Sequence, residues 1–289
     1  MICIQFSGGL GNQFFQYAIG RSLALRHQTE LIFDTSILSS KCRGITPRNF
    51  DLVHFKIKGR LASAYEMAFI KKERHLRFLP LVEKKWVFCS EKGRNFNPNF
   101  INYPNQSYLS GYWQSHKYFS AISDVLLTEL VPVEEISTKA KNLQKLIFSE
   151  NSVAIHIRRG DYVTLESASN YHGLLDISYF SQAIDIARNN LKKPVFYIFS
   201  DEIEWCSSQK IFTAADIIIS DNNMIEDFLL MSDCKHHIIS NSSYSWWAAW
   251  LGDHKSELDD RLVIGPKNWF KKCNELDIKS RMPDHWIKL

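Results

Sequence analysis

The chain has 289 residues, of which 45% are hydrophobic and 23% are charged. This composition excludes disordered, collagen-like and low-complexity proteins, and the length allows one large domain or two domains that each bury a core. Its 35 basic and 31 acidic side chains leave a formal net charge of +4. A charge this small does not indicate nucleic-acid binding.

Cysteine usage and the first residues of the chain favour a cytoplasmic location. None of the six cysteines forms a C-x-x-C pair, so we expect reduced, mostly buried thiols. The pattern of a secretory signal is missing at residues 1–6, and no stretch approaches the ~20 apolar residues of a membrane span. We interpret the basic run Lys71-Lys72-Glu73-Arg74 as a solvated face. Peripheral contact with anionic lipid at the inner membrane face is the alternative.

The first half of the chain opens as an α/β domain. An apolar strand is expected at 2–6, followed by a glycine-rich turn at 8–13 and a helix whose apolar residues 15, 18, 19 and 23 share one face. A second strand is expected at 31–34. Residues 40–110 show weak periodicity, and we expect mixed helix and loop there.

The second half alternates strands with helices. After a short helix at 123–130 and a boundary near 132–135, we expect a helix at 137–149 and a strand at 153–157. Helices at 179–191, 204–212 and 224–231 then alternate with strands at 195–199, 217–219 and 237–239. A capping cluster at 241–243 and a helix that ends at Gly252 follow. Such alternation indicates parallel sheets. We therefore expect an α/β protein with two Rossmann-like domains, residues 1–135 and 136–289.

The first candidate site follows the expected strand at 153–157. His156 and Arg158 share one face of that strand and lie where parallel sheets bind ligands. A guanidinium can grip a diphosphate bidentately without losing its charge. The alternative is that Arg158 or Arg159 pairs with Asp161 and closes the turn.

The second candidate is the serine-rich segment between a strand and the helix that follows it. Free backbone N–H groups at a helix start, next to the hydroxyls of Ser242 and Ser243, form an anion site. Capping of the helix by either serine is compatible with this role. For the tryptophans that follow, Trp246, Trp247 and Trp250, we expect core packing rather than stacking on a sugar.

The third candidate is the glycine-rich turn Gly8-Gly9-Leu10-Gly11-Asn12-Gln13. It approaches the dinucleotide fingerprint, but Phe14 stands where the third glycine belongs. Asp34 ends the next strand, at the place of a ribose-binding acid, so an NAD(P)-dependent oxidoreductase is one alternative function. The 13% aromatic content suggests another, a non-catalytic glycan-binding protein.

Carboxylates that could carry chemistry are Asp201, Asp227 and Glu166. No D-x-D occurs in the chain, so the carboxylate pair that often holds a metal-bound nucleotide diphosphate in sugar transferases is missing. This favours neutralisation of a diphosphate by arginine and a helix dipole, and we expect neither a metal nor another cofactor.

Taken together, these motifs resemble those of the bacterial α-1,2-fucosyltransferases. The resemblance spans nearly the whole chain in the family's order, and its segments are Gly8 to Ala18, Gly111-Tyr112-Trp113-Gln114-Ser115, His156 to Tyr162, Phe199-Ser200-Asp201, Asn241 to Trp247 and Met282 to Trp286. It implies a GT-B fold, with two Rossmann-like domains facing across a cleft. It also implies transfer of L-fucose from GDP-β-L-fucose, a co-substrate, to the 2-hydroxyl of a terminal β-galactose. Inversion and metal independence are further implications.

The same resemblance assigns roles to residues of the second half. Arg158 would hold the donor diphosphate, His156 would help place the guanosine, and Asp227 would read the guanine edge. Ser242 and Ser243 would meet the β-phosphate, and Asp201 and Tyr244 complete the donor-binding set. Residues 136–289 would thus bind GDP-fucose, while residues 1–135 form the acceptor side.

Gly11, Asn12 and Gln13 would lie at the junction of donor and acceptor, and Asn12 is also a candidate for catalysis beside Arg158. The base that accepts the acceptor proton is left open between Glu166 and Asp161. The acceptor would be a β-galactoside-terminated glycan, free or lipid-linked, in the synthesis of a bacterial surface polysaccharide.

Overall fold

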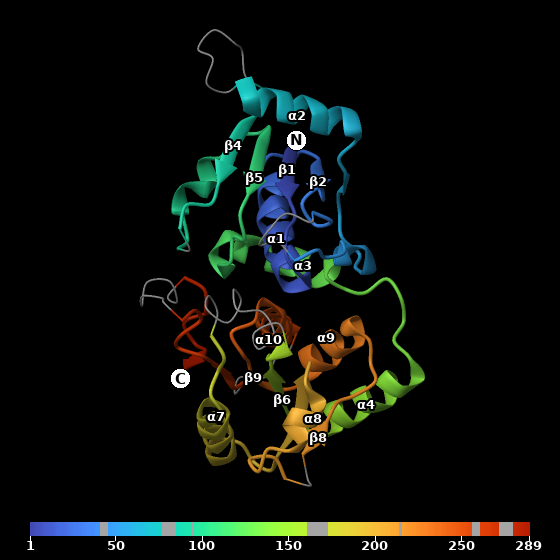
Figure 1. The fold of residues 1–289 in the computed structure, drawn as a ribbon, viewed down its shortest axis with the longest axis vertical. Helices are drawn as coiled ribbons and strands as arrows, with labels where there is room; N and C mark the ends of the chain where they lie inside the picture. The colour runs from blue at the N-terminus through green and yellow to red at the C-terminus, as the bar shows by residue number, and fades with distance from the viewer. Residues whose placement is uncertain are drawn as a thin grey trace. The chain divides into compact units, whose positions relative to one another are not determined.

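The structure, a computed structural model, describes residues 1–40, 46–76, 85–93, 95–160, 173–213, 216–255, 261–271 and 280–289. Within it the chain divides into two compact units, Met1–Val133 and Glu134–Leu289 (Figure 1). Each unit carries its own parallel sheet, and the expected α/β fold class is confirmed. No helix in these ranges is long and apolar enough to cross a membrane.

The first unit is built on a five-stranded parallel sheet with the order β3-β2-β1-β5-β4. Its strands are β1 (Ile2–Gln5), β2 (Leu31–Asp34), β3 (Arg60–Leu61), β4 (Val87–Ser90) and β5 (Ser107–Ser110). Its α-helices are α1 (Leu10–Arg26), α2 (Ala64–Leu76) and α3 (Ser123–Glu129), with 3-10 turns at Asp51–His54, Pro98–Asn102, His116–Tyr118 and Ser120–Ile122.

Close packing of α1 against the sheet explains the apolar stripe that the sequence shows. Phe15, Ala18, Ile19 and Leu23 are all buried, as expected. On the same helix, a Cβ at Gly20 would lie 3.0 Å from Leu31 Cδ1, so the missing side chain lets α1 lie directly on β1 and β2. The helix thereby fixes where the glycine-rich turn meets the end of β1.

The expectation of mixed helix and loop over residues 40–110 is wrong in part, because β3, β4 and β5 lie there. The strand β3 has only two residues, and both are exposed. The sequence of β4, Val-Phe-Cys-Ser, has an irregular burial pattern. Neither strand shows the regular alternation of a half-buried strand, so the sheet neighbours and not the local sequence define them.

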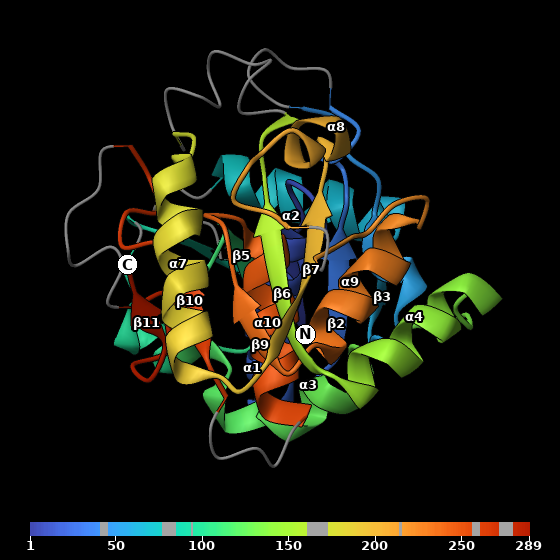
Figure 2. The same ribbon diagram turned by 90° about the horizontal axis from the view of Figure 1, so that it is seen from below.

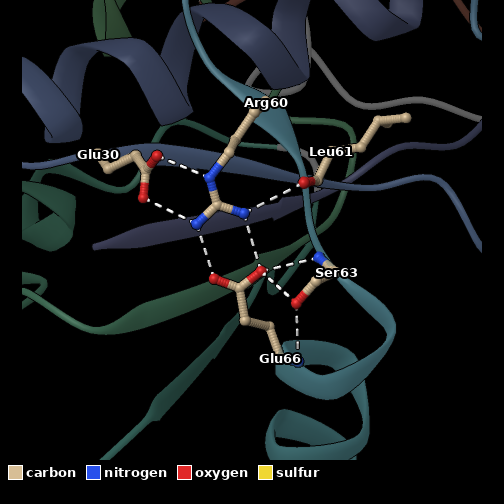
Figure 3. Close-up of polar contacts among 5 residues, drawn as sticks. All are labelled: Glu30, Arg60, Leu61, Ser63 and Glu66. Carbon is tan, nitrogen blue, oxygen red and sulfur yellow. Dashed lines mark hydrogen bonds and ion pairs between the residues drawn. The ribbon is translucent and has the colours of Figure 1, made fainter.

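A cluster of charges fastens the start of α2 (Figure 3). The Arg60 guanidinium contacts Glu30 and Glu66, each at 2.7 Å, and Glu66 also accepts a hydrogen bond from the Ser63 backbone N–H at 2.7 Å. The bonds from Arg60 are the main reason that the pKa of Glu66 falls to about 2. This arrangement joins β3 to the turn before β2 and caps α2 in its first turn.

The second unit carries a six-stranded parallel sheet with the order β11-β10-β9-β6-β7-β8. Its strands are β6 (Asn151–Ile157), β7 (Pro194–Ser200), β8 (Ile217–Ile218), β9 (His236–Ile238), β10 (Val263–Gly265) and β11 (Ile287–Lys288). Its described helices are α4 (Thr138–Ser149), α7 (Ile177–Asn190), α8 (Ile203–Ser207), α9 (Met224–Asp233) and α10 (Ser243–Lys255). The helix expected at 204–212 ends early, at Ser207.

Helices cover both faces of this sheet. In Figure 2, α7 lies on the opposite side of β6 from α4 and α9. Phe180, Ala183 and Ile184 of α7 pack with Val153 and Ile155 of β6 in one buried cluster. The three tryptophans of α10 are at most 1% exposed, which confirms their expected place in the core. The polar ends of β6 and β9 are therefore held by a well-packed sheet.

Candidate functional site

The candidate site of the second unit lies where the order of its strands reverses. The chain proceeds from β6 outward through β7 to β8, and later from β9 on the other side of β6 outward to β11. The carboxyl ends of β6 and β9 are adjacent. After β6 the chain continues to β7 on one side of this pair, and after β9 it continues to β10 on the other side. Ligands of open α/β sheets bind at such a switch point. His156 and Arg158 come from β6 and its end, and Ser240 to Ser243 follow β9.

His156 links the two strands. Its ring is 6% exposed, and Nδ1 lies 2.8 Å from Ser240 Oγ. Burial, reinforced by the nearby Arg158 charge, lowers the pKa of the His156 imidazole to about 3. The ring is therefore neutral at pH 7 and can position a neutral group such as a nucleoside without adding charge.

The two arginines after β6 have carboxylate partners on the neighbouring strand end. Arg158 Nη1 lies 2.7 Å from Asp201 Oδ2, and Arg159 Nε lies 3.0 Å from Glu202 Oε2. Arg159 also stacks on the Trp205 ring, 3.9 Å from its centroid. The Arg158 side chain keeps 30% of its surface exposed, so it is oriented by Asp201 and still accessible to an anion.

Asp201 therefore acts from β7 as a support for the turn after β6. Its second oxygen, Oδ1, accepts a hydrogen bond from the Arg159 backbone N–H at 3.0 Å. A Cβ added at Gly160 would lie 2.7 Å from Oδ2, so a larger residue there would displace the Asp201 carboxylate. The alternative of an arginine paired with Asp161 concerns a residue outside the described ranges, and the described partners are Asp201 and Glu202.

Asp227 and Tyr244 form the side of the site that lies toward α9. Asn222 Nδ2 donates to Asp227 Oδ1 at 3.0 Å, yet burial raises the pKa of this carboxyl to about 6. The Tyr244 hydroxyl donates to the Met224 carbonyl at 2.6 Å, and its ring centroid lies 5.7 Å from that of His156. Burial and the Asp227 charge raise the Tyr244 pKa, while Arg158 opposes them. The ring contact places Tyr244 next to His156.

The start of α10 supplies the other side. Ser242 and Ser243 are half-buried, and the Ser242 carbonyl accepts the first helical hydrogen bond, from Trp246 N at 3.0 Å. The N–H groups of the first turn have no partner within the helix. Asn241 fixes the approach to this turn by donating from Nδ2 to the Gly173 carbonyl at 3.1 Å. A cavity of about 490 Å³ adjoins the turn, with Asn241, Asn268 and Phe270 in its lining.

The expected residues of the first unit have different surroundings. Gln13 is fully buried, and its Nε2 donates to the carbonyls of Gly8 at 2.9 Å and Asn49 at 2.8 Å. Its Oε1 accepts from Asp51 N at 2.9 Å. Gln13 therefore holds two loops together, and its role toward a ligand stays a prediction. Gly11 is buried as well, whereas Asn12 is half-buried and accepts from Gln114 Nε2 at 2.6 Å.

The structure thus gathers most of the expected donor-binding residues in the second unit, namely His156, Arg158, Asp201, Asp227, Ser242, Ser243 and Tyr244. Gly11, Asn12 and Gln13 lie in the first unit, at the carboxyl end of β1. Both candidate bases, Asp161 and Glu166, fall outside the described residues, and their roles stay predictions. Sequence reasoning missed Asn222, the partner of Asp227. It included Ser240 in the serine-rich segment but did not predict its contact with His156.

Asp34, on which the oxidoreductase alternative depends, is 2% exposed. Its Oδ2 accepts from the Tyr108 hydroxyl at 2.7 Å, and Oδ1 accepts from Ser36 N at 2.9 Å. Each oxygen of this buried carboxylate thus already accepts a hydrogen bond from the protein. In the part of the chain that the structure describes, no group of three or more His, Cys, Asp or Glu side chains is placed to hold a metal ion. Metal independence stays a prediction.

The model of one protein family, described as glycosyl transferase family 11, matches residues 1–287. The alpha-1,2-colitosyltransferase of Escherichia coli is 32% identical over 301 residues, which cover 100% of this chain and 99% of that protein. The O-antigen biosynthesis glycosyltransferase WbnK of Escherichia coli is 33% identical over 310 residues and covers 98% of each chain.

More distant similarities agree. Galactoside 2-alpha-L-fucosyltransferase SEC1 of Bos taurus is 28% identical over 152 residues, which are 50% of this chain and 41% of that protein. The crystal structure of fucosyltransferase NodZ from Bradyrhizobium superposes with a TM-score of 0.52 at 12% identity, over 86% of this chain and 92% of that one. The latter shows a shared fold. Because the family model spans nearly the whole sequence, the resemblance seen in the motifs is confirmed, and the chain belongs to glycosyl transferase family 11.

Proposed function

We propose that this chain transfers L-fucose from GDP-β-L-fucose to the 2-hydroxyl of a terminal β-galactose, with inversion at the anomeric carbon. The observation that carries the proposal is the site at the β6–β9 switch point, where an oriented arginine and a helix start come from adjacent strand ends. Family membership makes a glycosyl group the transferred unit. The oxidoreductase and the non-catalytic alternatives are set aside on the same ground.

The donor nucleotide would be recognised by groups of matching chemistry. The Asp227 carboxylate accepts hydrogen bonds, which suits the N–H groups on the edge of guanine. Neutral His156, fixed by Ser240, would orient the nucleoside. Arg158 and the first-turn N–H groups of α10 would bind the diphosphate, since cations and helix N-termini both stabilise phosphate oxygens.

In the proposed reaction, the acceptor 2-hydroxyl attacks the anomeric carbon as the bond from that carbon to the β-phosphate oxygen breaks. The electron pair of the broken bond stays on GDP, and Arg158 with the α10 start would stabilise the added charge. The hydroxyl proton passes to a base, for which Glu166 and Asp161 are the candidates. A leaving group stabilised in this way lowers the demand on that base.

L-Colitose is the alternative donor sugar, because a relative that matches over the full length is named an alpha-1,2-colitosyltransferase. Colitose is 3-deoxyfucose, so the two donors differ by one hydroxyl group. A site that hydrogen-bonds the 3-hydroxyl would reject the deoxy sugar, whereas an apolar surface there would accept it.

Purified protein supplied with equal concentrations of both GDP-sugars and a β-galactoside distinguishes the two donors, with the product linkage assigned by NMR. Preference for GDP-colitose would contradict the proposed donor, and a linkage other than α-1,2 would contradict the proposed acceptor position.

We propose a cytoplasmic enzyme of surface polysaccharide synthesis whose acceptor is a free or lipid-linked oligosaccharide, in line with a relative named for O-antigen biosynthesis. Exposed Lys71 and Lys72 on α2 support peripheral contact with anionic lipid. Fractionation of cells, with and without a high-salt wash of the membranes, tests this location.

A further inference from the structure

The first unit has a switch point of its own, between β1 and β5. From β1 the sheet extends through β2 to β3 on one side, while β5 and then β4 lie on the other. The pairing of Ile4 with Leu109 brings the carboxyl ends of β1 and β5 together. Two motifs follow these ends, the glycine-rich turn after β1 and Gly111 to Ser115 after β5. The second motif has no part in the donor site described above.

The segment after β5 adopts a backbone conformation that its sequence does not favour. Trp113 has φ = 54° and Gly111 has φ = 152°, and a positive φ is uncommon for a bulky residue such as tryptophan. A conformation of this kind persists only where surrounding contacts impose it, and such sites concentrate where proteins bind ligands.

Three hydrogen bonds and one buried ring contact hold this conformation. The Glu91 carboxylate accepts hydrogen bonds from Tyr112 N at 2.7 Å and from Trp113 N at 3.0 Å. Gln16 Nε2 donates to the Gly111 carbonyl at 3.0 Å. The Trp113 ring is 1% exposed and meets the Tyr118 ring edge to face, with centroids 5.6 Å apart.

Tyr112 lies within this segment and is exposed. Its side chain is 46% exposed, between a glycine and a buried tryptophan. Two residues further on, Gln114 Nε2 donates to Asn12 Oδ1 at 2.6 Å and thereby ties the segment after β5 to the glycine-rich turn. The two segments at this sheet edge thus carry an exposed aromatic ring and two neutral amides.

This combination matches a neutral sugar. A pyranose ring offers an apolar face of C–H bonds, which stacks on an aromatic ring, and a rim of hydroxyls, which bond amide groups. We infer that the terminal β-galactoside of the acceptor stacks on Tyr112, with its hydroxyls held by Asn12 and Gln114; this assignment rests on the proposed function. Glu91 acts as a positioning residue, because its carboxylate fixes the backbone that presents the tyrosine.

The test compares Tyr112→Ala with Tyr112→Trp and with the control Tyr65→Ala, which removes an 81% exposed tyrosine on α2 of the same unit. Kinetics at saturating GDP-fucose should show the acceptor KM raised about tenfold for Tyr112→Ala, since stacking and apolar contact are lost. The donor KM and GDP affinity should stay unchanged. Tyr112→Trp should keep the acceptor KM within about threefold of the wild type, and Tyr65→Ala should leave it unaltered.

Binding without turnover gives a second readout. Saturation-transfer NMR with methyl β-galactoside should show contact in the wild type and a strong loss in Tyr112→Ala, with melting temperatures confirming that each variant is folded. An unchanged acceptor KM in folded Tyr112→Ala would overturn the inference, and so would an equal loss in Tyr65→Ala. If the wild type fails to bind GDP in calorimetry, the proposed function itself is contradicted. The two failures are therefore distinguishable.

Discussion

The two sheets of this protein are both parallel and both have a switch point beside their first strand, and they differ in what they place there. Between β6 and β9 stand charged groups, with Arg158 held by Asp201 at 2.7 Å and a helix start alongside. At the ends of β1 and β5 lie the neutral amides of Asn12 and Gln114 and an exposed tyrosine, Tyr112, whose backbone N–H donates to Glu91. A switch point in a parallel sheet can therefore serve a pyrophosphate in one unit and an uncharged sugar in the other. What differs is the short segment after each strand. Substitutions in one of these segments should weaken binding of one substrate and leave binding of the other unchanged.

The largest effect is expected at Arg158. Arg158→Ala removes the cation and leaves the Asp201 carboxylate facing the place proposed for the diphosphate. We expect kcat/KM to fall at least about a thousandfold, because loss of one preorganised group at a developing charge costs that order of rate and the freed carboxylate adds repulsion. Steady-state assays with GDP-fucose and a β-galactoside measure it.

Two further variants sharpen that result. Arg158→Lys keeps the charge without the bidentate geometry and should recover only a small part of the rate. Arg188→Ala, an exposed arginine on α7 of the same unit, should leave activity unchanged. Near wild-type activity in Arg158→Ala would remove the basis for placing the diphosphate at the β6–β9 switch point.

A smaller effect is expected at Asp227. Asp227→Asn should weaken GDP binding roughly tenfold to a hundredfold, the range for loss of hydrogen bonds to a charged group. The raised pKa, about 6, gives a signature of its own. The carboxylate that accepts from guanine exists above this pKa, so wild-type affinity should fall as the pH drops through about 6.

Titration calorimetry between pH 5 and 8 checks this, with Asp227→Asn as the reference because its side chain cannot titrate. Protonation of GDP itself affects both proteins equally, so only the difference between their affinity profiles reports Asp227. Parallel profiles would show that this carboxyl does not contact the base. Binding of acceptor galactoside should stay the same in both proteins, which is the behaviour that separates the two switch points.

The sequence predicted the second unit better than the first, and the reason lies in burial. Strand β7 is apolar along most of its length because helices cover both of its faces, so it is recognisable on its own. The residues of β3 are exposed, and β4 is mostly exposed or half-buried. Such strands form because they pair with neighbouring strands in the sheet, and the hydrophobic pattern of their own sequence does not reveal them.

For the site, sequence reasoning found residue types and missed their partners. The guanidinium of Arg158 meets Asp201, which lies 43 positions along the chain and becomes adjacent only through the β6–β7 register that pairs Ile157 with Ser200. The segment that carries Tyr112 has a positive φ at Trp113, which no residue preference of tryptophan indicates. Contacts that depend on strand register or on backbone strain require the tertiary structure.

The smallest effect on catalysis is expected at Gln13, and it separates a structural role from a ligand role in the first unit. Gln13→Ala leaves the carbonyls of Gly8 and Asn49 and the N–H of Asp51 without their observed partner. Buried polar groups that lose a partner cost stability, so the free energy of unfolding should fall by about 3 kcal/mol. Donor affinity of the folded fraction should be unchanged, because the Gln13 amide already bonds groups of the protein itself.

Urea denaturation measures the free energy of unfolding, and calorimetry with GDP measures the donor affinity. Asn99→Ala, which removes an exposed amide of the same unit, is the matched control. A Gln13→Ala protein of wild-type stability whose donor or acceptor affinity has dropped would instead make Gln13 a ligand-binding residue, as the motif alone predicts.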